Sequence, residues 1–322
     1  KKLDTVLLSI TIGLLVFGVL MVYDASVVYA HDVFGGKYHF LLRQLFWAII
    51  GSVGAGVLYF LDFKLLRSLV VPLFLLSLGL LFLLVIPRFI SFPLYDRFAP
   101  EVNGARRWLV LNPPGVLPAV PLLSRISFQP SEFAKFSLVL YLAAWFAGQN
   151  KVKRKKSSLA NGAKKLPGFL SVIFLLAVTG GLVLMEPDFA TTAVIVAIGL
   201  WMYFVAGAPL FPLVGGSLAV IAAGIGFIWS SPYRRRRLLT FLDPSRADPL
   251  SAGYHLRQIL IALGSGGVLG VGLGESRQKY GYLPEAAGDS IFAIIGEEFG
   301  FFGTAFLVLV FMLFLWRSFM II

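Results

Sequence analysis

The chain has 322 residues, of which 58% are hydrophobic, 15% aromatic and 14% charged, and its formal net charge is +12. Soluble domains carry roughly 25% charged residues, so this composition excludes a single soluble core and predicts a polytopic membrane protein. The chain has no cysteine, which excludes disulfides and cysteine-ligated metals. Its basic charge lies mostly in loops beside apolar segments, which argues against nucleic acid as a partner.

Eight apolar segments follow one another along the chain, and each approaches the roughly 20 residues that a membrane-spanning helix needs. They lie at about 5–29, 45–61, 68–87, 132–148, 168–185, 190–206, 210–230 and 290–316. Pro187, between the fifth and sixth segments, suits a tight turn better than a helix interior. We therefore predict an all-α polytopic membrane protein, a bundle of about eight transmembrane helices in one domain over residues 1–322.

Lysine and arginine in the short loops indicate which side of the membrane is cytoplasmic. With eight spans, the basic short segments fall on one side: Lys1 and Lys2, Lys64 and Arg67, the stretch 151–165, and Arg317. We assign this side to the cytoplasm, so the N-terminus and a flexible basic loop at 149–166 are cytoplasmic. Two long loops, at about 88–131 and 231–289, then face outward.

Both outer loops carry clustered arginines, against the usual bias toward basic residues on the inner side. These are Arg106, Arg107, Arg234, Arg235, Arg236 and Arg237. Long loops cross the membrane largely regardless of charge, so a solvated loop or a contact with lipid headgroups is one interpretation. The other is an anion site, because guanidinium groups present donors that match phosphate oxygens. Two clusters beside one membrane face favour a lipid-linked phosphate over a soluble one.

A short apolar stretch, 255–264, precedes the glycine-rich stretch 264–274 in the second outer loop. The apolar stretch is too short to span a bilayer, so we expect an interfacial or re-entrant helix packed against the bundle. The glycines follow no strand and lack the G-x-x-x-x-G-K-[ST] pattern, so they do not indicate nucleotide binding.

Two short segments near predicted helix ends contain acidic residues. Glu132 and Lys135, three residues apart near the start of the fourth segment, share one face of a helix. We expect an ion pair that stabilises the helix start, and a role in positioning substrate or relaying its charge is the alternative. Glu186 and Asp188 flank Pro187 in an outer turn, where they are either solvated or directed into an outer cavity.

Three more acids lie in or directly before the last segment. Glu297 and Glu298 lie inside it, and adjacent helical residues point in different directions, so we do not expect them to share one partner. At least one should face a basic residue or a polar cavity, and both structural pairing and functional use stay open. Asp289 precedes the segment, where a helix N-terminus favours an anion. It is either a cap or a base that takes a proton from a sugar hydroxyl while arginines hold a phosphate leaving group.

Several of these segments together resemble one family. They are 103–108, 128–135, 186–188, 253–258, 272–279, 282–285 and 289–298. In this order, over most of the chain, they resemble the SEDS family (shape, elongation, division, sporulation) of bacterial membrane proteins that polymerise peptidoglycan glycan strands from lipid II. The segment 277–279, Arg-Gln-Lys, favours the FtsW-like branch of the family over the RodA-like branch.

The resemblance implies an inverting glycosyltransferase at the outer face of the cytoplasmic membrane, serving division or elongation. The 4-hydroxyl of an incoming lipid II sugar attacks the anomeric carbon of the growing chain, and undecaprenyl pyrophosphate leaves. The family's essential aspartate falls on Asp289, and its membrane Glu/Lys pair on Glu132 and Lys135. Besides the outer arginines, we expect substrate contacts from Gln258, Arg277, Gln278, Lys279 and Glu285.

The partners that the resemblance implies are lipid II, the nascent glycan strand, a single-pass class B penicillin-binding transpeptidase, and other division or elongation proteins. No cofactor is certain, and a divalent cation, Mg²⁺ or Mn²⁺, stays open. A lipid II flippase and a non-catalytic scaffold of the division machinery are the alternative functions. Flipping predicts charges spread through the membrane depth, whereas the dense charges here gather on the outer face.

The sequence departs from the family pattern at three places. Ala287 and Gly288 stand where the family usually has His-Thr or His-Asn, and Ser290 replaces a common phenylalanine. The family has ten spans, so we expect this chain to lack the last two.

Overall fold

The computed structural model describes residues 3–89, 95–102, 104–112, 126–156, 168–208, 210–230, 232, 235–236, 238–239 and 252–320. Its contacts divide the chain into two compact units. Unit 1 comprises Lys1–Leu58 and Gly226–Ile322, and unit 2 comprises Tyr59–Ile225.

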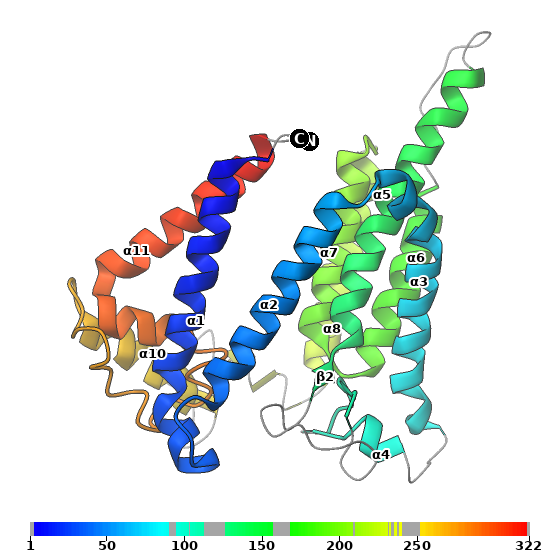
Figure 1. The fold of residues 1–322 in the computed structure, drawn as a ribbon. Coiled ribbons are helices and arrows are strands. Elements are labelled where there is room, and N and C mark those ends of the chain that lie inside the picture. Colours follow the sequence, from blue (N-terminus) through cyan, green and yellow to red (C-terminus); the bar gives the residue numbers. More distant parts are fainter. Residues whose placement is uncertain are drawn as a thin grey trace. The chain divides into compact units, whose positions relative to one another are not determined.

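The described residues are overwhelmingly helical, which confirms the all-α prediction (Figure 1). The helices are α1 (Thr5–Phe34), α2 (His39–Phe60), α3 (Phe63–Val85), the 3-10 turn η1 (Ile86–Arg88), α4 (Tyr95–Phe98), α5 (Pro130–Lys156), α6 (Phe169–Met185), α7 (Phe189–Val205), α8 (Leu210–Trp229), α10 (Ala252–Gly266) and α11 (Ile291–Met320). Each of the eight predicted spans overlaps a helix. By length and composition, α1, α2, α3 and α11 can each cross a membrane, and α6 and α7 are shorter apolar helices.

Several predicted helix boundaries are wrong because basic and polar residues lie inside helix ends. The prediction started α2 near residue 45 and α3 near residue 68, whereas they begin at residues 39 and 63. Lys64 and Arg67 therefore belong to α3 rather than to a loop. Long basic side chains can cover apolar surface while their charge reaches water, so a helix continues through them where an apolar window stops. The first predicted span ends near residue 29, whereas α1 continues through the polar residues His31 and Asp32 to Phe34.

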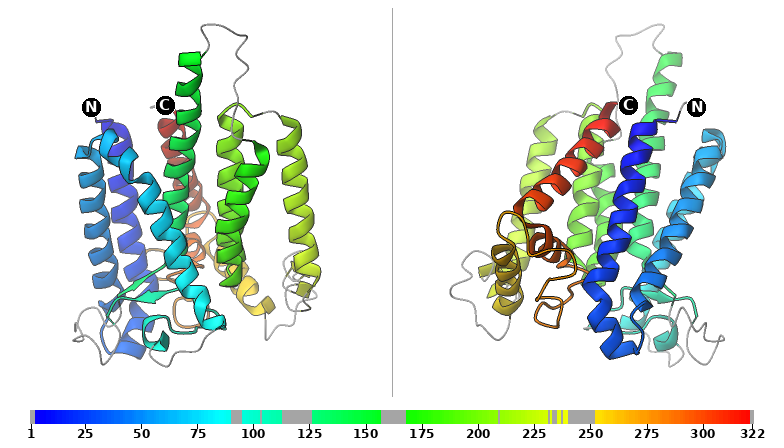
Figure 2. Two further views of the ribbon diagram at one scale, coloured as in Figure 1. Left: turned by 90° about the vertical axis from the view of Figure 1, so that its right-hand side faces the viewer. Right: turned by 60° about the vertical axis from the view of Figure 1, so that its left-hand side comes forward.

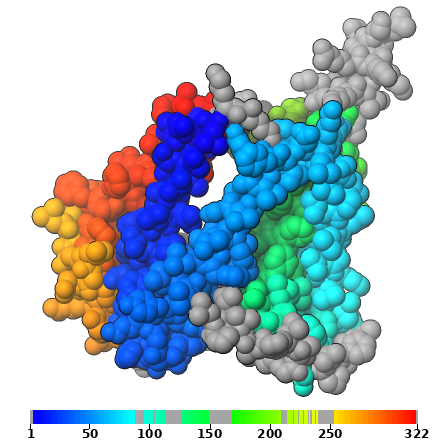
Figure 3. Space-filling model, viewed as in Figure 1, coloured from blue at the N-terminus to red at the C-terminus, as the bar shows by residue number. Residues whose placement is uncertain are grey.

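Unit 1 is built around α1, α10 and α11. Their core contains Met21 and Ala25 of α1, Ala262 of α10 and Ile294 of α11, all nearly inaccessible to solvent. An ion pair between Nη2 of Arg317 and Oδ2 of Asp4, 2.7 Å apart, joins the end of α11 to the start of α1. These two helix ends are in contact in the space-filling view (Figure 3). The N-terminal end of α1 and Arg317 thus lie at one end of unit 1.

The last predicted span is not one straight helix. Gly300 has φ 64° and ψ −162°, which is not helical and separates α11 into a short first part and a long second part (Figure 2). A break of this kind leaves backbone groups without intrahelical partners. They pair with the glycine-rich stretch after α10: the N–H groups of Val271 and Gly272 donate to the carbonyls of Glu297 and Glu298, and those of Phe301 and Phe302 donate to the carbonyls of Gly267 and Val268.

The glycines allow this close backbone approach. A Cβ atom added at Gly270 would lie 2.1 Å from the carbonyl oxygen of Glu298, and one added at Gly300 would lie 2.3 Å from the nitrogen of Gly270. Both residues also have positive φ, a conformation that side chains disfavour. The predicted apolar helix with its glycine turn is confirmed as a helix packed against its neighbour, and the glycines are the reason that the two segments can interlock.

Unit 2 contains α3, α5, α6 and α7, which run side by side (Figures 1 and 2). Their core includes the fully buried residues Leu81, Leu138, Leu142 and Ile195. At one end of these helices β1 (Leu109–Val110) pairs antiparallel with β2 (Ser127–Phe128), with Leu109 opposite Phe128. The sequence predicts no strands, because a ladder of two residues on each side is too short to show a periodic pattern.

Candidate functional site

Asp289 lies on an exposed turn directly before α11. The turn is closed by two backbone hydrogen bonds to the carbonyl of Glu285, from the N–H of Gly288 at 3.0 Å and from that of Ser290 at 3.2 Å. The Asp289 carboxylate makes no hydrogen bond or ion pair with any other described residue. The capping interpretation therefore has no hydrogen bond to support it, and the carboxylate is available to an external ligand.

The turn that carries Asp289 is attached to α10. The hydroxyl of Tyr254 donates to the carbonyl of Tyr282 at 2.8 Å, near the start of the turn. At its end, Nε2 of His255 lies 2.6 Å from Oγ of Ser290, which is only 2% exposed. The sequence alone predicts no role for Tyr254 or His255, because no pattern around Asp289 shows that residues more than thirty positions earlier contact its turn.

Glu297 is a buried carboxylate with a full set of donors. It accepts hydrogen bonds from Oγ of Ser276 at 2.5 Å, from the backbone N–H groups of Arg277 at 3.2 Å and Gln278 at 3.3 Å, and from Oγ of Ser265 at 3.3 Å. Several donors compensate a buried carboxylate for the hydration that it loses. Glu297 therefore anchors the loop after the glycine-rich stretch to α11.

Glu298 is also buried and binds the same loop. Its Oε1 accepts from the N–H of Ser276 at 3.2 Å and lies 3.0 Å from Nζ of Lys279, which in turn lies 2.9 Å from Oδ1 of Asp24 on α1. The expectation that Glu297 and Glu298 do not share a partner is thus wrong. Residues 276–279 curve around the end of the first part of α11, so adjacent side chains reach one loop from two directions.

Lys279 has little exposed surface, with 3% of its side chain accessible. Burial disfavours its charged form, but the hydrogen bonds and negative charges of Asp24 and Glu298 outweigh this and raise the pKa of Lys279. The sequence analysis did not predict a role for Asp24, although a single acid inside an apolar run indicates a buried polar partner.

The predicted substrate-binding residues of unit 1 differ in accessibility. Gln278 and Lys279 are buried, and Gln258 is half-buried. The exposed residues are Arg235, Arg236, Arg277, Glu285 and Asp289. Arg234 and Arg237 lie outside the described residues. Exposed guanidinium and carboxylate groups are those that can reach an external ligand without rearrangement of the fold.

In unit 2, protein groups hold both arginines of the loop that the sequence predicts as the first outer loop. Nη1 of Arg106 lies 2.5 Å from Oδ1 of Asp96 and also donates to the carbonyl of Ala99. Nη2 of Arg106 lies 3.3 Å from Oε2 of Glu101. Arg107 donates to the backbone carbonyls of Glu186 and Pro187. The two guanidinium groups thus fix the outer loop and tie it to the turn between α6 and α7.

That turn holds an acid with unusual chemistry. Both carboxylate oxygens of Glu186 are buried and lack a hydrogen-bond partner among the described residues. Burial, and then the charge of Asp188, raise the pKa of Glu186 to about 8 although Arg107 lowers it. Asp188 itself caps α7, accepting from the N–H and the hydroxyl of Thr191 at 3.1 Å and 2.8 Å.

The predicted pair at the start of α5 is present. Nζ of Lys135 lies 2.7 Å from Oε1 of Glu132, an ion pair that both a stabilising role and a role toward substrate allow. Within the described ranges no three His, Asp or Glu side chains converge on a point that could hold a metal ion.

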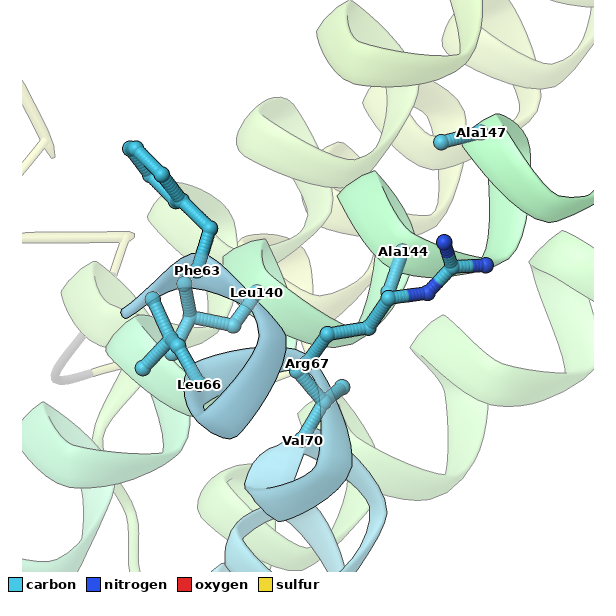
Figure 4. Close-up of a pocket in the computed structure, with 7 residues that line it drawn as sticks. All are labelled: Phe63, Leu66, Arg67, Val70, Leu140, Ala144 and Ala147. Carbon is cyan, nitrogen blue, oxygen red and sulfur yellow. The ribbon is translucent and has the colours of Figure 1, made fainter. Parts of the chain in front are cut away.

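A groove of about 230 Å³ lies between α3 and α5 of unit 2 (Figure 4). Its lining is apolar except for Arg67, and includes Phe63, Leu66, Val70, Leu140, Ala144 and Ala147. It contains no acid and none of the predicted site residues. We therefore do not identify it with the catalytic cavity.

Comparison with known proteins identifies a family for this chain and similar solved structures. The family of cell cycle proteins that comprises FtsW, RodA and SpoVE matches residues 5–322. Among curated proteins, the chain is similar to the probable peptidoglycan glycosyltransferases FtsW of Nitrosococcus halophilus (38% identity, over 99% of this chain and 74% of that protein) and of Trichlorobacter lovleyi (36%, over 98% and 74%).

Two solved structures are also similar. One is described as the structural coordination of polymerization and crosslinking by a peptidoglycan synthase complex, with a TM-score of 0.65 and 26% identity over 98% of this chain and 76% of that one. The other is the rod shape determining protein RodA of Thermus thermophilus, with a TM-score of 0.59 and 23% identity over 98% and 73%. At this identity the second likeness concerns the fold alone.

Proposed function

Because the chain belongs to the family of cell cycle proteins that comprises FtsW, RodA and SpoVE, we propose that it is a peptidoglycan glycosyltransferase that polymerises lipid II at the outer face of the bacterial cytoplasmic membrane. Curated relatives that carry the name probable peptidoglycan glycosyltransferase FtsW support the reaction class. The many apolar helices support a multi-pass membrane location.

The observation that carries the proposal is the exposed carboxylate of Asp289, which has no partner among the described residues. In the proposed reaction Asp289 takes the proton of the 4-hydroxyl of the incoming sugar. That oxygen forms a bond to the anomeric carbon of the growing chain, and the bond from this carbon to the pyrophosphate oxygen breaks. Undecaprenyl pyrophosphate leaves with the electron pair, which gives inversion at the anomeric carbon.

The leaving group gains negative charge as the bond breaks, and positive groups that face it stabilise the transition state. Arg235, Arg236 and Arg277 are exposed in unit 1 and are our candidates for this role. Arg106 and Arg107 already bind protein groups, so we assign them to holding the outer loop. A class B penicillin-binding transpeptidase is the proposed partner, and the likeness to a chain of a peptidoglycan synthase complex supports it.

The test is polymerisation of lipid II by the purified full-length protein, reconstituted with its transpeptidase, with glycan strands separated by gel electrophoresis. General base catalysis contributes about 10²–10⁴-fold, so Asp289→Asn should lose at least about 100-fold in rate. The matched control is Glu275→Gln, an exposed acid nearby in the sequence, which should polymerise as the wild type does.

Equal rates for Asp289→Asn and the wild type would remove Asp289 from the reaction. A flippase would instead move fluorescent lipid II across vesicles without polymerising it, and a scaffold would do neither. Each alternative therefore gives its own result in the same preparation.

A further inference from the structure

Two consecutive residues of α10 hold the turn that carries Asp289. The hydroxyl of Tyr254 binds the carbonyl of Tyr282, and Nε2 of His255 binds Oγ of Ser290, the residue next to Asp289. Ser290 is buried, so this contact is not one that water readily replaces. Of these two hydrogen bonds from α10, the one made by His255 lies closer in sequence to Asp289.

The hydrogen bonds around Ser290 define which group donates. A serine hydroxyl has one proton, and Oγ of Ser290 lies 3.2 Å from the carbonyl oxygen of Pro284, which can only accept. If the hydroxyl donates to this carbonyl, His255 must supply the proton of the 2.6 Å contact through Nε2–H. This arrangement satisfies both contacts, whereas the reverse direction leaves the contact between Ser290 and the Pro284 carbonyl without a proton.

The platform that carries His255 is rigid. At the other end of α10, a Cβ atom at Gly266 would lie 2.0 Å from the carbonyl oxygen of Gly296, so the two backbones are in direct contact. Ala262 is fully buried against α11. An imidazole on such a helix holds its partner in a defined place, as positioning groups must.

We propose that His255 is the positioning residue for Asp289: its Nε2–H fixes Ser290 and thereby the backbone and the direction of the neighbouring carboxylate. The inference rests on the proposed function, in which Asp289 is the base. His255 itself touches no reacting atom. Loss of its hydrogen bond therefore misplaces the base and lowers kcat, and it leaves lipid II binding, and hence KM, almost unchanged. A misplacement of about 1 Å can cost about 100-fold in rate.

The experiment compares His255→Leu, His255→Gln and Ser290→Ala with the wild type in the polymerisation assay, with kcat and KM measured separately. Glutamine has an N–H donor at nearly the same reach as Nε2, whereas leucine fills the space without a donor. We expect His255→Leu and Ser290→Ala each to lose about 10–100-fold in kcat, and the double variant to lose no more than either single one. His255→Gln should recover most of the rate. The control is His31→Leu, at an exposed histidine of α1.

The outcomes separate this inference from the proposed function. If wild-type protein polymerises lipid II and Asp289→Asn does not, then wild-type kcat in His255→Leu overturns the positioning role, as does a His255→Gln variant no better than His255→Leu. If His255→Leu does not fold, Ser290→Ala, which removes only the hydroxyl, decides by the same criterion. If wild-type protein makes no polymer at all, the proposed function fails, and this inference fails with it.

Discussion

Nζ of Lys279 lies 3.0 Å from Oε1 of Glu298. The same ammonium lies 2.9 Å from Oδ1 of Asp24, so one cation faces two carboxylates from α1 and α11. The second oxygens, Oδ2 of Asp24 and Oε2 of Glu298, are buried and have no hydrogen-bond partner among the described residues. An uncompensated buried charge is costly, so Lys279 is the cation that compensates both acids.

This charge balance predicts unequal effects of substitution. Lys279→Met should lower the free energy of unfolding by about 3–5 kcal/mol, because it leaves two buried acids without a cation. Asp24→Asn or Glu298→Gln should each cost less, about 0.5–1.5 kcal/mol, because Lys279 keeps the other carboxylate as its partner and an amide keeps an acceptor. Lys64→Met, at an exposed lysine, is the control. Unfolding in detergent micelles measures all four, and a Glu298→Gln variant as unstable as Lys279→Met contradicts this charge balance.

The interlocked backbones of α11 and the glycine-rich stretch give a second prediction, at three glycines with different surroundings. Gly270 has φ +84° and no room for a Cβ atom, Gly281 has φ +87° with open space, and Gly264 has neither constraint. Gly270→Ala should destabilise by about 2–5 kcal/mol, from strain and overpacking together. Gly281→Ala should cost about 1–2 kcal/mol from strain alone. Gly264→Ala should stabilise α10 by up to about 1 kcal/mol. Melting temperatures in any other order contradict this account.

Hydropathy was sufficient to place the helices, because each span is a long apolar run that few other structures explain. It could not place the break at Gly300, since glycine is common in membrane helices and only the partner stretch 267–272 shows why this one is bent. The sequence predicts Asp289 just before the last apolar segment, and it lies there on an exposed turn. The support from His255, by contrast, depends on how α10 folds back, and no sequence period encodes that contact.

Glu186 predicts a pH dependence of stability. In the unfolded chain its pKa has the ordinary value of 4.5, and in the folded protein burial raises the pKa to about 8. Between these values the unfolded chain has lost a proton that the folded protein still holds, so stability falls as pH rises, by at most about 1.4 kcal/mol per pH unit, and levels off above pH 8.

Glu186→Gln removes this dependence, because a glutamine is neutral at every pH. We expect the variant to become progressively more stable than the wild type from pH 5 to pH 8. Thermal unfolding at each pH measures the difference, and Glu275→Gln, at an exposed acid, should show no such trend. Parallel curves for Glu186→Gln and the wild type contradict the raised pKa.

Arg235 and Arg236 are exposed and form no hydrogen bond or ion pair with another described residue, which distinguishes them from Arg106. If they bind the pyrophosphate of lipid II, the double variant Arg235→Gln, Arg236→Gln loses charge-assisted hydrogen bonds of about 1.5–3 kcal/mol each. The Kd for lipid II should therefore rise at least about tenfold, and binding should depend less steeply on salt. Lys64→Gln, which removes an exposed charge from α3, should leave the Kd unchanged. A double variant that binds lipid II as tightly as the wild type would leave Arg277 as the remaining exposed arginine among our candidates for the pyrophosphate.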